Sequence, residues 1–160
     1  MSVVDSATMP SNRAARRRRI ALPLLVRGLG MGAVHTGARM LLAYAVEYWT
    51  PMTGLLKWLA LGGVMVIALI WGVFDGRRNL SECERPDPDL VVFWLRAAVL
   101  AGLSSGVLTW IAGRVTEISS DGHALLFEVT AGAAWILLVT YVPALLGVAV
   151  ARRLGARGDR

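Results

Sequence analysis

Three ionisable side chains interrupt otherwise apolar stretches of the sequence, and these residues are the best candidates for chemistry. His35 and Arg39 are four residues apart, so a helix would place them one turn apart on the same face. Glu128 lies near the start of another apolar stretch. An arginine near the centre of a bilayer costs about 2.5–3.5 kcal/mol and usually faces a partner or water. We therefore expect Arg39 and Glu128 to pair inside a helix bundle, with His35 one turn deeper.

Two interpretations of this pair stay open at the sequence level. It either locks the fold or serves in gating or substrate binding, because intramembrane ionisable residues are often functional. His35 alone is more typical of a hydrogen-bonded packing residue than of a ligand. His123 and Cys83 are the only other histidine and the only cysteine, and their positions give no sensible metal-site spacing. We expect no metal, no cofactor and, without a phosphate loop or nucleophile motif, no enzymatic activity.

Small residues recur at helical spacing in the same apolar stretches. Small residues three or four positions apart allow close backbone approach, which is a main source of helix association in lipid. We expect these glycines to pack helices together; a homodimer seam or a substrate path are the functional alternatives. The glycines concerned are Gly28, Gly32, Gly37, Gly102, Gly106 and Gly132.

Four long apolar blocks must position all of these residues. The chain has 160 residues, of which 56% are hydrophobic, with a mean hydropathy of +0.56. Each block has about the 20 residues that cross a hydrocarbon core, and a lone helix in lipid satisfies its own backbone hydrogen bonds. The sequence predicts an all-α membrane protein with four transmembrane helices in an antiparallel bundle. The predicted helices cover about residues 20–46, 55–74, 90–113 and 124–150 of a domain spanning 20–153, with a disordered basic cytoplasmic tail over 1–19 and a cytoplasmic tail over 154–160.

The placement of the basic residues predicts the orientation of these helices. Of 17 lysines and arginines, 14 fall on one side of the blocks, Lys57 and Arg114 fall on the other, and Arg39 lies within. Short loops rich in arginine stay in the cytoplasm, so both termini are predicted to be cytoplasmic in a multi-pass protein of the cell membrane. The same placement argues against nucleic-acid binding despite the net charge of +6. The 14 residues are Arg13, Arg16, Arg17, Arg18, Arg19, Arg27, Arg77, Arg78, Arg85, Arg96, Arg152, Arg153, Arg157 and Arg160.

Two stretches of sequence resemble a known family. The stretch from Leu25 to Arg39 reads LVRGLGMGAVHTGAR, and the stretch from Leu126 to Ala134 reads LFEVTAGAA. They resemble the small mycobacterial membrane proteins of the bacterial four-helix drug/metabolite transporter (B-4DMT) family, over about residues 22–154. The resemblance implies a plasma-membrane location and a transport role, with His35, Arg39 and Glu128 at the polar positions of the pattern. The scarcity of lysine and the wealth of alanine, glycine and valine also indicate a GC-rich, actinobacterial genome.

Two functions follow from these observations. The first is a small transporter-like protein of unknown substrate that acts as an oligomer, because four helices leave little room for a substrate cavity. The second is a non-catalytic accessory subunit of a larger membrane complex, such as a lipid-export or respiratory assembly. Membrane lipids are expected partners in both cases. A transporter should show a polar path lined by Arg39, His35, Glu128 and the small residues. An accessory subunit should instead bury those polar groups in contacts and present an apolar face to a partner.

Overall fold

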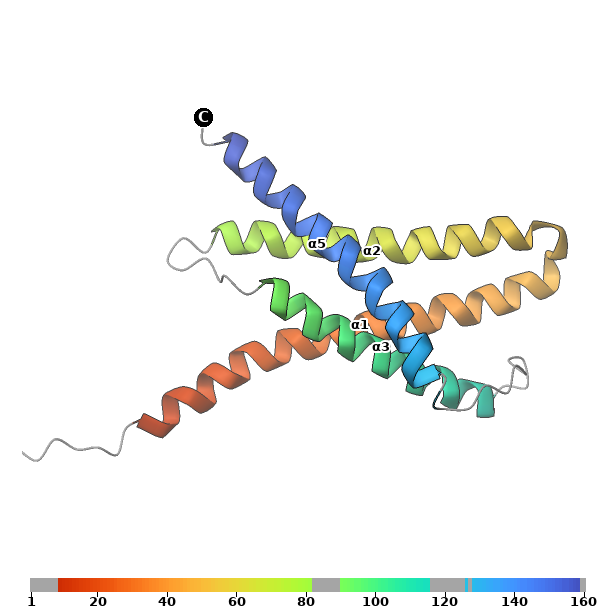
Figure 1. Cartoon of the computed structure of the whole chain (residues 1–160), viewed down its shortest axis with the longest axis horizontal. Helices are drawn as coiled ribbons and strands as arrows, with labels where there is room; N and C mark the ends of the chain where they lie inside the picture. The colour runs from red at the N-terminus through yellow and green to blue at the C-terminus, as the bar shows by residue number, and fades with distance from the viewer. Residues whose placement is uncertain (1–8, 82–89, 116–125, 127, 159–160) are drawn as a thin grey trace, which may run out of the picture.

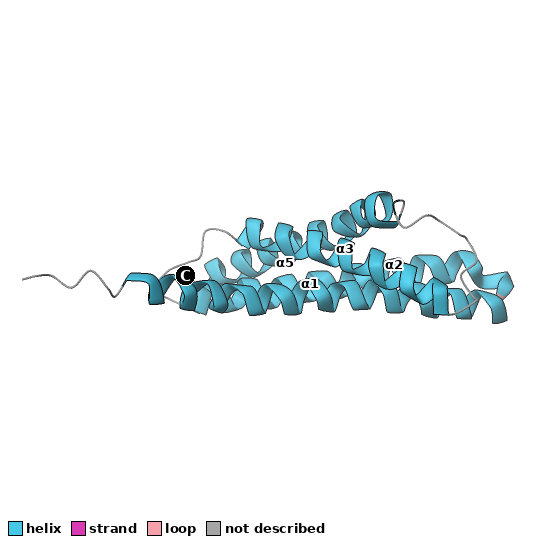
Figure 2. Ribbon diagram, turned by 90° about the horizontal axis from the view of Figure 1, so that it is seen from below, coloured by secondary structure: helices cyan, strands magenta, loops and turns pink. Residues whose placement is uncertain are grey.

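A computed structural model describes residues 9–81, 90–115, 126 and 128–158, and the regular structure in this part of the chain is entirely helical (Figure 2). The predicted all-α class is therefore confirmed. The elements in chain order are α1 (Met9–Tyr48), a short 3-10 helix η2 (Thr50–Met52), α2 (Thr53–Ser81), α3 (Leu90–Val115), a π-helical turn η3 (Glu128–Gly132) and α5 (Ala133–Gly158).

The first helix is longer than the sequence analysis predicts. α1 begins at Met9 and not near Ile20, so residues 9–19 of the predicted tail are helical. Alanine and arginine are good helix formers, and nothing between Asn12 and Pro23 breaks the helix. Pro23 itself lies inside α1, where its carbonyl oxygen accepts a hydrogen bond of 3.2 Å from Nη1 of Arg27.

The second and last helices also extend beyond their predicted ends. α2 continues to Ser81, so residues 75–81, which follow the predicted end at residue 74, are helical. Asp75 is held there by a contact with α1 that is described below. α5 continues to Gly158, whereas its predicted end is residue 150. Cys83 and His123 lie outside the described residues.

Three of the helices are long and apolar enough to cross a membrane. α1 does not reach the same mean hydropathy, because its glycines, His35 and Arg39 lower the average. These findings are consistent with a small membrane protein. The three spans are Thr53–Asn79, Leu90–Arg114 and Val129–Ala156.

Figure 1 shows how the four long helices are arranged. The chain runs from left to right along α1, returns along α2, runs back along α3 and returns along α5, so the start of α1 and the end of α5 lie toward the same side of the picture. The most extensive contacts are between α2 and α5 and between α1 and α3, followed by α3 with α5. α1 and α2 touch less, and this weaker contact leaves room between them.

Small side chains dominate the buried core. Ala97, Ala98 and Ala101 of α3 are completely or almost completely buried, and so are Ala68 of α2 and Ala144 of α5. Lipid tails are as apolar as leucine, so helices in a membrane gain little from burying large apolar groups and associate by close packing. Many large apolar side chains are accordingly exposed on each long helix, as Leu41, Ile70, Leu103 and Leu146 illustrate, although Trp94 and Met31 are completely buried.

Candidate functional site

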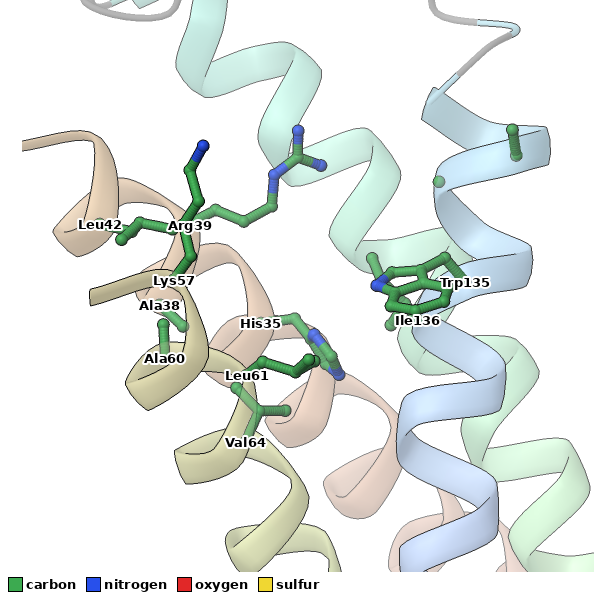
Figure 3. A pocket seen from close by; sticks show the side chains of 12 residues that line it. His35, Ala38, Arg39, Leu42, Lys57, Ala60, Leu61, Val64, Trp135 and Ile136 are labelled. Atoms are coloured by element: carbon green, nitrogen blue, oxygen red, sulfur yellow. The ribbon is translucent and has the colours of Figure 1, made fainter. Parts of the chain in front are cut away.

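A cleft opens between α1, α2 and the start of α5 (Figure 3). Its volume of ≈ 470 Å³ falls in the range of small-molecule binding sites. The cleft is the best candidate for a functional site because it gathers charged, polar and aromatic groups from three segments that are distant in sequence. It is lined by His35, Ala38, Arg39 and Leu42 from α1, by Lys57, Ala60, Leu61 and Val64 from α2, and by Ala131, Gly132, Trp135 and Ile136 from η3 and α5.

The helical repeat of α1 brings His35 and Arg39 to the cleft together. These two residues and the apolar Ala38 and Leu42 lie at spacings of three and four, which is one face of a helix. In Figure 3 the side chains of Arg39 and Lys57 occupy one end of the cleft, and His35 lies further along it. We call the end with Arg39 and Lys57 the cationic end of the cleft, and the end with His35 the deeper end.

His35 joins α1 to α5 at the deeper end. The residue is 7% exposed, and its Nε2 lies 3.0 Å from Oγ1 of Thr140, which is completely buried. One of the two groups donates and the other accepts, depending on the imidazole tautomer. The hydrogen bond satisfies both groups in an apolar surrounding, where an unpaired polar group is costly. His35 thus lines the cleft while it links two helices.

The other wall of the cleft begins with a π-helical turn. In η3 the backbone has a wider turn than an α-helix, and such turns occur frequently at functional sites. Ala131 and Gly132 of this turn and Trp135 of α5 line the cleft. Figure 3 shows the indole of Trp135 on the wall opposite His35. The sequence analysis does not identify Trp135 or Lys57 as site residues.

The predicted pair of Arg39 and Glu128 stays a prediction. Glu128 begins η3, one turn before the cleft-lining Gly132, but its side chain lies outside the described part of the structure. Arg39 lies in the cleft beside His35, and no acidic residue is among the described residues that line it. Among the described residues, no group of three or more potential metal ligands lies together.

The predicted packing glycines occupy different surroundings. Gly28 faces Leu100, and Gly32 faces Ser104 and the carbonyl oxygen of Ala101, so both contact α3. A Cβ atom at Gly102 would lie 2.6 Å from the carbonyl oxygen of Ala133. Gly106 is buried and Gly132 lines the cleft, whereas Gly37 is exposed and a Cβ there would meet nothing within 4 Å.

Sequence reasoning missed the glycine contacts that bring α2 against α5. A Cβ atom at Gly72 would collide with the backbone of Ala144, at 2.8 Å from its carbonyl carbon. One at Gly147 would lie 2.7 Å from the backbone nitrogen of Val73, and one at Gly76 2.7 Å from Cβ of Ala151. The signal was present in the sequence, since Gly72 and Gly76 are four residues apart in the small-xxx-small spacing.

Sequence reasoning also missed an ion pair between α1 and α2. Arg27 donates from Nε to Oδ2 of Asp75 at 2.6 Å, and its Nη2 donates to Oδ1, so the pair is bidentate. The side chains are 13% and 5% exposed, and the guanidinium carbon lies 5.4 Å from the ring centroid of Phe93 on α3. The signal available was that both residues lie at the same end of adjacent predicted helices.

A row of hydroxyl groups links α1 to α3 beside the cleft. The hydroxyl of Thr36 donates to the carbonyl oxygen of Gly32 at 3.0 Å. Its single proton is used there, so the hydroxyl of Ser105, 3.1 Å away, donates to Thr36. Thr109, one turn further along α3, is buried and its Oγ1 has no partner among the described residues.

Comparison of the sequence with models of known protein families and with curated proteins gives no match.

Proposed function

We propose that the chain is a transporter-like, non-catalytic protein of the cell membrane that acts as an oligomer on a small substrate. The cleft carries this proposal. A membrane helix bundle that only anchors itself has no need of a cavity of ≈ 470 Å³ lined by Arg39, Lys57 and His35. Charged groups within a membrane domain are costly, and they commonly mark a substrate pathway. The resemblance of the sequence to the B-4DMT family agrees with this function.

In the proposed topology α1 is a fourth span, the bundle is antiparallel and both termini are cytoplasmic. Three polar groups of α1 support a membrane position, because they face other helices. His35 bonds to Thr140, Thr36 contacts Ser105 and Arg27 pairs with Asp75. With these groups satisfied inside the bundle, α1 presents mainly apolar side chains outward, and the distribution of the arginines sets the direction of insertion.

A second candidate function is an accessory subunit of a larger membrane complex. The observation that favours it is the exposure of α2, since only 17% of the most apolar stretch of this helix is buried. That side fits either lipid or an apolar partner protein. Its large residues include Leu55, Trp58, Leu59, Val66, Ile70 and Phe74.

Gentle isolation of the tagged chain from its native membrane, followed by mass measurement of the intact particle, separates the two functions. A small particle that holds only copies of this chain is expected for the transporter. A large particle with other proteins would contradict it and favour the accessory subunit. Transport into vesicles, with Glu128→Gln as the comparison, then tests the activity directly.

The topology is tested with a membrane-impermeant maleimide on intact cells. Cys83 is the only cysteine and serves as the cytoplasmic reference, which should react only after the cells are opened. In a chain carrying Cys83→Ser, Met52→Cys should react in intact cells, because Met52 is exposed in η2 at the proposed outer end. Ala14→Cys should stay protected like Cys83. Reaction of both Ala14→Cys and Met52→Cys in intact cells would show that α1 does not cross the membrane.

A further inference from the structure

We infer that the cleft binds an amphipathic organic anion, with its carboxylate or phosphate group between Arg39 and Lys57 and its apolar body directed toward Val64 and Trp135. The inference rests on the proposed function and names the substrate class for that same site. It follows from three features of the cleft: the charge at one end, the apolar lining of the remainder, and the length of the path between them.

The charged end combines two cations from two helices. Arg39 comes from α1 and Lys57 from α2, and Figure 3 shows their side chains at the same end of the cleft. Arginine presents paired donors that match the oxygens of a carboxylate or phosphate, and lysine adds a compact charge. Lys57 keeps this end of the cleft positive whichever groups Arg39 contacts. A cationic substrate would therefore be repelled where an anionic one is held.

The remainder of the cleft is apolar. Leu61 and Val64 of α2 and Trp135 and Ile136 of α5 line it, and the polar His35 in this region is already bonded to Thr140. Hydrophobic and aromatic walls with a few placed polar groups are typical of small-molecule sites. A wholly polar anion would leave this wall without a partner, so the ligand must carry an apolar body next to its charge.

The dimensions fit one charged group with one short apolar body. Lys57 and Val64 are seven residues apart on α2, which corresponds to about 10 Å along the helix axis. Lys57 lies one turn into α2, close to the exposed Trp58, and tryptophan prefers the membrane–water interface. A ligand with its charge at Lys57 would therefore have its charge near the membrane surface and its body at the depth of the hydrocarbon. Both an anionic lipid and a free metabolite offer this chemistry.

Quenching of tryptophan fluorescence tests the inference in nanodiscs of phosphatidylcholine. The probes are terminally brominated laurate, the matching brominated alcohol and the matching trimethylammonium compound, which share an apolar body and differ in charge. The full-length protein should bind the anion about tenfold more tightly than the alcohol. It should bind the cation more weakly than the alcohol. Trp135→Phe should remove the saturable quenching. Equal binding of the three probes, or saturable quenching that persists without Trp135, would overturn the inference.

Charge reversal at one exposed position provides the decisive variant. Lys57 is exposed, so Lys57→Glu should fold normally and lose the preference for the anion. Arg77→Gln is the matched control, because it removes an exposed cation from the other end of the same helix and should leave all three affinities unchanged. Unchanged probe preference in the Lys57 variant, or the same loss in the control, would contradict a site in the cleft.

Replacing part of the phosphatidylcholine by phosphatidylglycerol distinguishes the two sources of the anion. If the lipid headgroup occupies the site, the apparent affinity for brominated laurate should fall by more than its partition into empty nanodiscs of the same composition. If a free metabolite is the ligand, the two changes should be equal. Because binding is measured without transport, anion binding with no uptake into vesicles would overturn the transporter but not the ligand class. Uptake of a different substrate without anion preference would do the reverse.

Discussion

Removal of the carboxylate charge in Asp75→Asn should destabilise the protein strongly, because it leaves Arg27 buried without its counter-ion. The guanidinium donates to both carboxylate oxygens, and the two side chains are only 13% and 5% exposed. The substitution keeps the shape of the side chain but replaces one acceptor oxygen by a donor amide. It therefore tests the charge and the hydrogen bonds and not the packing volume.

The size of the effect follows from the geometry of the pair. Two unit charges about 4 Å apart attract by about 4 kcal/mol at an effective dielectric constant of about 20. Breaking a buried pair by removing one partner typically costs about 3–5 kcal/mol, because the other charge stays buried and uncompensated. The contact of Arg27 with Phe93 and with the Pro23 carbonyl persists in the variant and offsets part of the loss. We expect a loss of about 3 kcal/mol in the free energy of unfolding.

Reversible unfolding in mixed detergent micelles, followed by tryptophan fluorescence, measures this loss. Arg77→Gln is the control, since Arg77 is exposed two residues further along α2 and its removal should cost under about 0.5 kcal/mol. The double variant Arg27→Gln with Asp75→Asn should lose clearly less than the sum of the single losses. If Asp75→Asn unfolds as easily as the control, or the two losses simply add, the pair does not hold α1 to α2.

Two further predictions concern packing and polar groups within the bundle. Gly72→Ala should lower the free energy of unfolding by about 1–3 kcal/mol, since its Cβ would press on the backbone of Ala144. Gly62→Ala should be tolerated, because nothing lies within 4 Å of a Cβ there. The unfolding midpoints of the two variants measure the difference, and equal midpoints would contradict the close α2–α5 contact. Thr140→Val should cost about 1 kcal/mol of stability through the lost hydrogen bond to His35. Thr109→Val should be neutral or stabilising, because the Thr109 hydroxyl has no partner among the described residues. The same unfolding assay compares the two variants, and the opposite order would refute the assignment of these hydrogen bonds.

Most of the helical fold could be predicted from apolar length, because a membrane leaves few alternatives to the helix. The apolar blocks of α2 and α3 begin within two residues of the predicted starts. The ends of the helices are harder to predict, since charged residues that follow an apolar block are compatible with both a loop and a helix. Asp75 illustrates the reason: within α2 it pairs with Arg27, which is 48 positions away in the sequence, and no local pattern reveals this contact.

The candidate site could be predicted only as far as one helix reaches. The spacing of His35 and Arg39 places both on one face of α1. Lys57 and Trp135 join them only through the way α2 and α5 cross α1, and the sequence does not encode a crossing angle in any local pattern. The sequence analysis also does not predict the π-helical turn before Trp135. A continuous α-helix would give this residue a different direction from the one in the structure.

The glycine contacts between α2 and α5 explain why the cleft lies where it does. Gly72 and Gly147 let the two backbones touch toward the ends of α2 and α5, and no side chain fits between them there. Figure 1 shows the two helices crossing and then separating toward the start of α5. At the separated end Leu61 of α2 and Trp135 of α5 line opposite sides of the cleft (Figure 3). The tight contact at one end thus produces the opening at the other, so a bulkier residue at position 72 should alter ligand binding in the cleft as well as stability.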